Sequence, residues 1–391
     1  MTNNSQSSKH SYFDLRLDRT GSGVTAAVTS SPAGQSSSPS AVILPAVSDL
    51  LQADSLPAAD QIALGCGLWH GLFAQAEIAE LWRSSNTSGR TLLRLTITDP
   101  ALAALPWELL FDPRTAQFVV LDTRAALVRF VPLPIAASSV PADLPLRVLF
   151  TGSSPAGLPG LNVERERQLL WDTLPGREMT LAGDVQSSTL SDLVAALGQG
   201  ATLWHFAGHG VEQALIFEDG DGNPVHADAF TVGTLLAGAG VRVAVINACR
   251  AGAGGGAASS IAGALLRAGV PVVVAMQSAI PDTAAVVFSK TVYESIALGN
   301  SVEQATTAGR RAIFALGQVA GASWWIPALF SRSDDPVVLV ERSSTGEGDT
   351  PTDHLAGAHT VASRNSAISQ GGVAISGQVG GSVVVVSTSR T

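Results

Sequence analysis

From Leu146 onward, apolar segments of strand-like length alternate with segments of helical pattern, and this alternation constrains the fold more than any other feature of the sequence. The apolar segments are rich in Val, Ala and Ile. Such strands, separated by helices, are typical of a parallel sheet that is buried on both faces. We therefore predict an α/β fold with helices on both faces of a parallel sheet. The predicted strands are 147–151, 180–182, 201–207, 241–247 and 270–276, and the predicted helices are 163–174, 189–197, 227–237, 258–268, 283–297 and 302–316.

The residues before this core predict a β-rich N-terminal extension of the same module. Segments 12–18 and 23–29 alternate in polarity around a turn, as in a β-hairpin. A helix is expected over 58–82, and strands over 91–98, 118–121 and 125–130. The Pro-rich stretch 132–145 indicates an internal boundary. We expect a disordered segment 1–11, a module 12–340 made of an N-terminal part 12–131 and a core 146–340, a linker 341–364 and a Gly-rich, β-prone motif 365–391.

The composition excludes several classes of protein. Apolar residues make up 46% of the chain and charged residues 14%, so most of it can form a buried core. The net charge of -9 disfavours binding to nucleic acid. The chain begins without the apolar core of a signal peptide, has no apolar run long enough to span a membrane, and has only two cysteines. We expect a cytoplasmic protein with reduced cysteines and no stable membrane span.

Two apolar segments each end in a reactive side chain beside glycine. LWHFAGHG ends near His209, and VAVINACRAG contains Cys249. The carboxyl ends of parallel strands lie at one edge of a sheet, which is where such folds bind ligands. The two residues are 40 apart (249 − 209), which is enough for one crossover helix between adjacent strands. The sequence therefore predicts that an imidazole and a thiol share one site.

This pair of side chains is suited to nucleophilic catalysis. A thiolate attacks a carbonyl far better than a thiol does, and a neighbouring imidazole can remove the thiol proton. The backbone N–H groups of Gly210 and Cys249 are the expected donors to the resulting oxyanion. The alternative interpretation is a buried structural cysteine and a histidine that only satisfies a turn.

Other motifs are interpreted structurally. His205 lies inside an apolar segment and is expected to pack within the sheet. Too few ligands surround the pair for a closed zinc site, and EDGDGNP is better interpreted as a β-turn than as a calcium loop. GSSPAGLPG has neither the lysine nor the spacing of a nucleotide-binding loop. We predict no cofactor and no metal.

The pair HFAGHG and INACRAG resembles the CHAT-domain family, the caspase-like cysteine peptidases related to separases and metacaspases. The resemblance covers most of residues 12–340. It includes LTITDPALAALPWELLFDP, RVLFTGSSPAGLPGLNVERERQLL, and ALGNSVEQATTAGRRAIF with WWIPALF, which look like the family's closing helices. It implies a caspase-like fold and cysteine endopeptidase activity with His209 as base and Cys249 as nucleophile.

Asp282 is the candidate substrate-binding residue. The surrounding AMQSAIPDTAAVVF is similar to a segment of separases in which an acidic residue selects arginine. The resemblance thus implies a preference for a basic residue before the scissile bond. An N-cap or first-turn carboxylate is the alternative interpretation.

The resemblance also suggests a role and partners. It implies limited proteolysis of a protein substrate as an effector in bacterial defence or programmed cell death. The uncharged C-terminal motif predicts binding to a sensor or signalling protein, or self-assembly. Two alternatives stay open: a catalytically silent adaptor that acts through this motif, and a thiol hydrolase of non-peptide acyl groups.

Overall fold

A computed structural model describes most of the chain up to residue 339 and two short strands near its end. The described residues are 11–21, 23–45, 56–86, 90–134, 137, 142–174, 179–185, 189–211, 213–250, 257–317, 321–334, 337, 339, 374–376 and 385–387. The chain divides into two units, Met1–Arg342 and Ser343–Thr391. Residues 340–341, where the module was predicted to end, lie outside the described residues.

The N-terminal part is β-rich, as predicted, but several of its elements differ from expectation. The β1–β2 hairpin is confirmed, although β1 begins at Ser11, one residue inside the segment predicted to be disordered. The expected helix 58–82 is two helices, because the backbone is extended at Gln75, whose side chain donates to the carbonyl of Ala41 at 2.9 Å. The expected strand 118–121 is mostly a 3₁₀ turn packed against α9. The elements are β1 (Ser11–Thr20), β2 (Gly23–Ser30), β3 (Ser40–Val42), α1 (Ala58–Phe73), α2 (Ala76–Ser85), β4 (Thr91–Ile97), α3 (Pro100–Ala103), η2 (Trp107–Leu109), β5 (Phe111–Asp112), β6 (Gln117–Phe118), η3 (Val119–Leu121) and β7 (Ala125–Phe130).

The second part is the predicted alternation of strands and helices. Every predicted helix from 163 onward is present within two residues of its expected limits. Three strands were not predicted, namely β11, β12 and β15. The elements are β8 (Leu146–Gly152), α4 (Val163–Thr173), β9 (Met179–Val185), α5 (Leu190–Leu197), β10 (Leu203–Val211), β11 (Ala214–Glu218), β12 (Pro224–Asp228), α6 (Ala229–Gly238), β13 (Val243–Arg250), α7 (Ala257–Ala268), β14 (Val272–Met276), α8 (Asp282–Ala297), α9 (Val302–Phe314), η4 (Gly321–Ser323) and β15 (Pro327–Ser331).

One large sheet joins the two parts. Its order is β12-β11-β10-β13-β14-β15-β7-β4-β1-β2-β3, with β8 paired to β10 and β9 paired to β8. The neighbours β9, β8, β10, β13 and β14 are parallel, which confirms the predicted parallel core. WWIPALF was expected to be helical, but Pro327–Ser331 forms β15, fully buried and antiparallel to β14. This strand connects the core to β7 of the N-terminal part.

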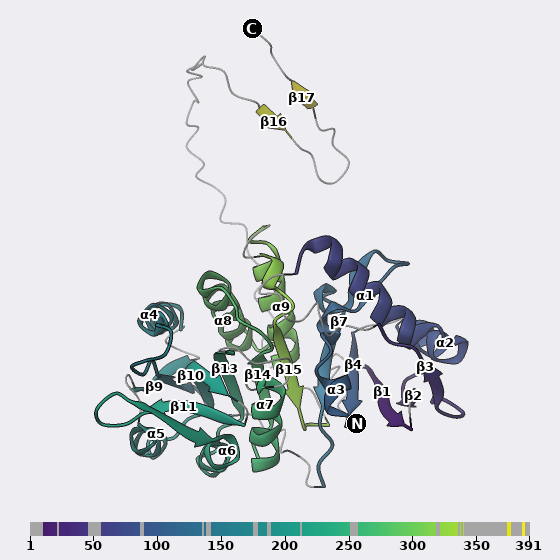
Figure 1. The fold of residues 1–391 in the computed structure, drawn as a ribbon. Helices are drawn as coiled ribbons and strands as arrows, with labels where there is room; N and C mark the ends of the chain where they lie inside the picture. Colours follow the sequence, from purple (N-terminus) through teal and green to yellow (C-terminus); the bar gives the residue numbers. More distant parts are fainter. Residues whose placement is uncertain are drawn as a thin grey trace, which may run out of the picture. The chain divides into compact units, whose positions relative to one another are not determined.

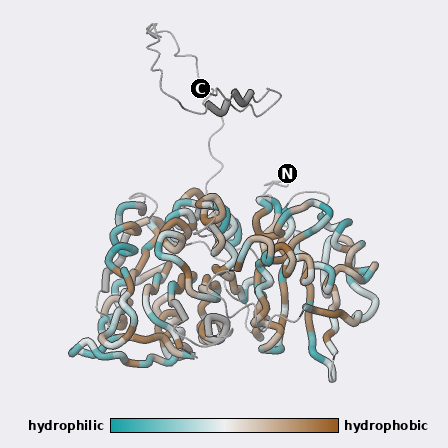
Figure 2. The backbone as a smooth tube through the Cα atoms, turned by 45° about the horizontal axis from the view of Figure 1, so that its top comes forward, coloured by the Kyte–Doolittle hydropathy of each residue, from teal (hydrophilic) through white to brown (hydrophobic). Residues whose placement is uncertain are grey.

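Helices cover both faces of the sheet (Figure 1). Helices α1, α4, α8 and α9 lie on one face, and α5, α6 and α7 lie on the other (Figure 1). The buried residues form two hydrophobic clusters, one with Leu68 and Phe288 and one with Leu193 and Leu265. The apolar strands run through the interior between these helices (Figure 2). A sheet buried on both faces explains why its strands are nearly continuous apolar runs.

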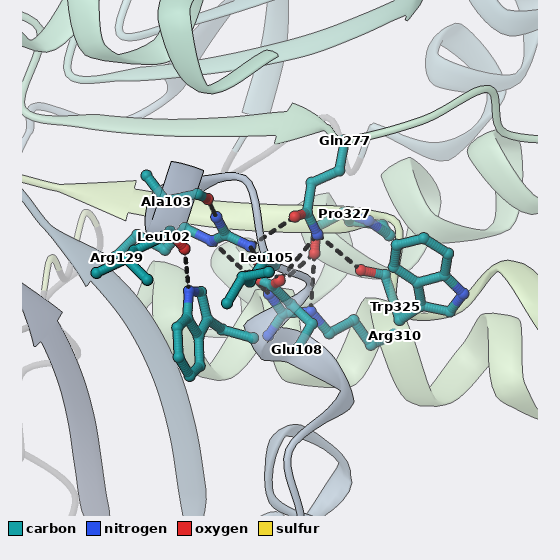
Figure 3. A network of polar contacts seen from close by, with 10 residues as sticks. Leu102, Ala103, Leu105, Glu108, Arg129, Gln277, Arg310, Trp325 and Pro327 are labelled. Atoms are coloured by element: carbon teal, nitrogen blue, oxygen red, sulfur yellow. Dashed lines mark hydrogen bonds and ion pairs between the residues drawn. The ribbon is translucent and has the colours of Figure 1, made fainter. Parts of the chain in front are cut away.

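A buried group of charged side chains links the N-terminal part to the core (Figure 3). The Glu108 carboxylate accepts two hydrogen bonds from Arg129, at 3.0 and 2.6 Å, and one from Gln277 at 2.8 Å. Arg310 lies 3.9 Å from the same carboxylate and donates to the carbonyl of Pro327 at 3.0 and 2.9 Å. Burial lowers the pKa of Arg310 to about 10, with Glu108 opposing the shift and Arg129 adding to it. Glu108 thus compensates two buried guanidinium groups.

Glu303 of α9 is a buried carboxyl whose charge costs stability. Burial raises its pKa, although the Ser301 side chain and the backbone N–H of Val337 oppose the shift. A carboxyl with a raised folded-state pKa holds its proton more tightly in the folded protein. Its contribution to stability is therefore present at low pH and is lost as the pH rises through the folded pKa.

We expect Glu303→Gln to remove this loss of stability. Between acid and neutral pH, the free energy of unfolding of the variant should rise by about 1 kcal/mol relative to that of the wild type, because no buried carboxylate has to form. Denaturant unfolding at several pH values measures the gain. The exposed Glu80→Gln is the matched control, and a gain that does not change with pH would contradict the expectation.

The C-terminal unit contains two described strands. Ala374–Ser376 (β16) pairs antiparallel with Val385–Ser387 (β17). The first strand is the second copy of the AIS repeat. The rest of the predicted linker and motif lies outside the described residues. Among the described residues, no helix is long and apolar enough to cross a membrane.

Candidate active site

The register of the sheet places His209 and Cys249 side by side. Strands β10 and β13 are parallel, and His209 is the direct Cα partner of Cys249. Both residues lie in the last three positions of their strands, since β10 ends at Val211 and β13 at Arg250. They were expected just beyond the strand ends, and the structure extends both strands to include them. The Cys249 side chain is not among those that the structure describes.

The His209 imidazole is buried and held by a backbone carbonyl. It is 2% exposed, and its Nε2 lies 2.9 Å from the carbonyl oxygen of Pro159. A carbonyl oxygen only accepts hydrogen bonds, so Nε2 carries the proton. In the neutral ring, Nδ1 is then the basic nitrogen. Within the described part of the chain, Nδ1 has no hydrogen-bond partner.

A narrow pocket lies next to this pair on the face covered by α4 and α8. Its volume is about 40 Å³, and it reaches Gly208 and Asn247, each within two residues of the predicted catalytic pair. A side chain at Gly208 would place a Cβ 2.6 Å from the Phe206 ring, so only glycine fits there. The lining residues are Leu161, Asn162, Val163, Arg165, Glu166, Ala207, Gly208, Asn247, Ile280, Asp282, Ala285 and Val286.

Glu166 lines this pocket and contacts two polar side chains of the sheet. Its carboxylate lies 2.9 Å from Nε2 of His205 and also accepts a hydrogen bond from the Asn247 amide. The other ring nitrogen of His205 lies 2.8 Å from the Tyr293 hydroxyl. Burial, and then the charge of Glu166, raise the pKa of Tyr293 well above its usual value, so the phenol stays protonated and can donate to His205. These hydrogen bonds hold the Glu166 carboxylate on the side of the sheet that faces the pocket.

The other predicted site residues have clear positions. Asp282 is the first residue of α8, is exposed and lines the pocket; the N-cap of α8 is Pro281, and no side chain caps the helix. Asp282 is thus both a first-turn carboxylate and a pocket residue. Gly210 lies between Leu215 of β11 and Arg250 of β13, and its role as an oxyanion donor stays a prediction. His205 is fully buried in the sheet, as expected.

Sequence reasoning missed two groups of this site. Glu166 belongs to the run ERER, whose dense charge is typical of a solvated helix face. The Pro159 carbonyl is a backbone group and has no side-chain signature. The one sequence signal near Glu166 was Asn162, a residue type that commonly caps helices. Its side chain accepts a hydrogen bond from the backbone N–H of Arg165 and so fixes the start of α4 beside the sheet edge.

The family model described as "CHAT domain" matches residues 64–333. A search of curated proteins found no match. Among solved structures, the chain is similar to the Arg-specific cysteine proteinase gingipain R, at 15% identity and a TM-score of 0.42, with 75% of this chain and 70% of that chain covered. It is also similar to the separase–securin complex of Saccharomyces cerevisiae, at 13% identity and a TM-score of 0.36, with 65% of this chain and 16% of that chain covered.

Proposed function

The chain belongs to the CHAT-domain family, and from this premise we propose that it is a cysteine endopeptidase in which His209 is the base and Cys249 the nucleophile. The observation that carries the proposal is the register of β10 and β13, which makes the two residues direct neighbours. The hydrogen bond from His209 Nε2 to Pro159 supports it, because this bond leaves Nδ1 as the proton acceptor.

The proposed reaction has two steps. In the first, His209 takes the thiol proton, the sulfur of Cys249 bonds to the scissile carbonyl carbon, and the imidazolium returns the proton to the departing amine. In the second, a water molecule loses a proton to the imidazole and attacks the thioester. The carboxylic acid product leaves, and the thiol is restored. The N–H groups of Gly210 and Cys249 are the proposed donors to the oxyanion in both steps.

An activity-based probe tests the proposal on the full chain. A peptide with an electrophile in place of the scissile carbonyl should modify Cys249 and leave Cys66, which lies in α1, unmodified. Mass spectrometry of the digested protein locates the adduct. Probe labelling with peptide turnover supports the endopeptidase, and labelling with turnover of non-peptide acyl substrates alone indicates the other hydrolase. An unreactive Cys249, with and without induced assembly, indicates the catalytically silent adaptor.

We further propose that the pocket beside Gly208 binds the residue before the scissile bond and prefers a basic one. Two carboxylates, Asp282 and Glu166, line the pocket together with one arginine, Arg165, so the carboxylates are in excess. A guanidinium or ammonium group of the substrate would pair with the uncompensated charge.

Asp282→Ala is expected to change this preference. Turnover of peptides with arginine before the scissile bond should fall about tenfold or more relative to peptides with an apolar residue there, because one charge-assisted contact is lost. A positional-scanning peptide library measures the ratio. The exposed Asp172→Ala, on the far end of α4, is the matched control. An unchanged profile in Asp282→Ala would overturn the assignment of Asp282.

The C-terminal motif is proposed to recruit the peptidase to a sensor or signalling protein, or to copies of itself, as an effector in bacterial defence or cell death. The uncharged composition of 365–389 and the β16–β17 pairing support a motif that adds strands to a partner. Deletion of residues 343–391 should then abolish partner-dependent activation. Unchanged activation and partner binding after this deletion would rule the role out.

A further inference from the structure

A second pocket, which shares no residue with the one beside Gly208, is surrounded by arginines. Its volume is about 200 Å³. It lies between α9, the end of α8 and the residues directly before and at the start of β4 and β7. The lining residues are Arg90, Leu92, Thr123, Arg124, Ala125, Ala126, Ser295, Asn300, Gln304, Thr307, Ala308 and Arg311.

The charge of this pocket is opposite to that of the protein. The chain has only 23 Lys and Arg residues and a net charge of -9, yet three guanidinium groups, from Arg90, Arg124 and Arg311, line one small cavity. None of the described lining residues is acidic. Asp122, outside the lining, pairs with Arg124 at 3.0 Å and so offsets one of the three charges. The pocket therefore keeps an uncompensated positive charge.

One buried hydroxyl beside the pocket lacks a hydrogen bond, although the lining residues Asn300 and Ser295 are hydrogen-bonded to each other. Thr307 of α9 is 4% exposed, and its hydroxyl has no hydrogen-bond partner in the described part of the chain. The adjacent Thr306 donates to the carbonyl of Val302 at 2.8 Å, as helical threonines commonly do. A buried hydroxyl without a partner costs about 1–3 kcal/mol. The Thr307 oxygen itself has almost no exposed surface, so it is not counted among the groups that contact a ligand.

Two of the three arginines are held in place before any ligand binds. Arg311 donates through Nη1 to the carbonyl of Leu121 at 2.7 Å, which leaves its other N–H groups for further bonds. Arg124 is held by two hydrogen bonds to Asp122, at 3.2 and 3.0 Å. Held guanidinium groups lose less side-chain entropy when they bind an anion.

We propose that this pocket binds a small phosphorylated anion. Guanidinium groups match the oxygens of a phosphoryl group in pairs, and side-chain amides such as that of Asn300 complete such sites. The cavity is smaller than the roughly 300–1,000 Å³ typical of drug-sized ligands, so the ligand is a free phosphate, a pyrophosphate or the phosphate end of a small monoester. The site is independent of the proposed peptidase reaction.

Calorimetric titration of the full chain tests the site directly. Inorganic phosphate, pyrophosphate and glycerol 3-phosphate are the probes, with chloride at matched ionic strength as the reference. Saturable binding is expected for at least one phosphorylated probe, and their relative affinities distinguish a free phosphate from a monoester. An absence of saturable binding for all three at millimolar concentration would overturn the proposal, whatever the peptidase assays give.

Substitutions distinguish binding in this pocket from nonspecific attraction to positive charge on the surface. Arg90→Gln and Arg311→Gln should each weaken binding about tenfold, as loss of one charge-assisted contact predicts. The exposed Arg16→Gln removes an equal charge elsewhere and should leave binding unchanged. Thr307→Val should leave binding unchanged and keep or raise the thermal midpoint of the ligand-free protein, because it removes an unsatisfied hydroxyl that the pocket does not reach. Equal affinity in the Arg90, Arg311 and Arg16 variants would show that the pocket is not the site.

Discussion

Replacing Cys249 with alanine is expected to lower peptide hydrolysis by about a thousandfold or more while the thermal midpoint changes little. Alanine removes the sulfur that is proposed to form the acyl-enzyme, and no other side chain on β10 or β13 is a comparable nucleophile. The residue occupies the second-last position of β13, so its loss leaves the strand pairing intact. Rates of peptide turnover and thermal unfolding measure the two effects.

Two further variants make this expectation specific. His209→Ala should lower turnover to a similar extent, and the double variant should be no slower than either single one, because base and nucleophile act as a unit. Cys66→Ala is the matched control, since this thiol lies in α1, far along the chain from both strands. Activity that survives in Cys249→Ala would contradict the proposed nucleophile and favour a different catalytic group.

Replacing Glu108 with alanine is expected to destabilise the protein by about 3–5 kcal/mol. Glu108 is fully buried and compensates Arg129 and Arg310, which are also buried. Without the carboxylate, two guanidinium groups stay in the interior with no anion among the residues of Figure 3. Breaking a buried pair by removing one partner costs far more than the intact pair contributes.

Denaturant unfolding measures this cost, and the exposed pair Lys290–Glu294 supplies a control. Its atoms are 3.8 Å apart and both side chains are about half exposed, so Glu294→Ala should change stability by less than about 1 kcal/mol. A double variant in which leucine replaces Glu108 and methionine replaces Arg310 should recover part of the loss, because fewer charges stay buried. A loss in Glu108→Ala no larger than that in Glu294→Ala would show that the buried group does not hold the two parts together.

The parallel core could be predicted because its strands are buried on both faces. Burial on both faces makes a strand such as Val272–Met276 a continuous apolar run, and such runs stand out between amphipathic helices. The hairpin of β11 and β12 was predicted only as a turn at EDGDGNP, because Pro224–Asp228 is mostly exposed and lacks a run of large apolar residues. β15 was missed because its five residues begin with a proline and follow two tryptophans and an isoleucine, a composition that does not distinguish a short buried strand from a helix.

The candidate site could be predicted only in part. His209 and Cys249 stood out because each interrupts an apolar segment near its end, and the register makes them neighbours. Glu166 could not be found this way, because its contact with His205 joins residues 39 apart through the fold. The same holds for Pro159, whose contribution is a carbonyl oxygen that every residue carries.

The pairing of β10 has a consequence for local stability. Because β13 pairs with residues 203–210 along one edge, the other edge is divided between β8, which pairs with 203–207, and β11, which pairs with 209–211. His209 therefore lies just past the point at which the strand paired to this edge of β10 changes from β8, a core strand, to β11, a strand of the hairpin. Amide hydrogen exchange should change sharply at this point, slow before Gly208 and faster after it. We expect the backbone at His209 to open together with the hairpin, at a free energy below that of global unfolding, so that on warming this part of β10 loses protection before the rest of the sheet melts.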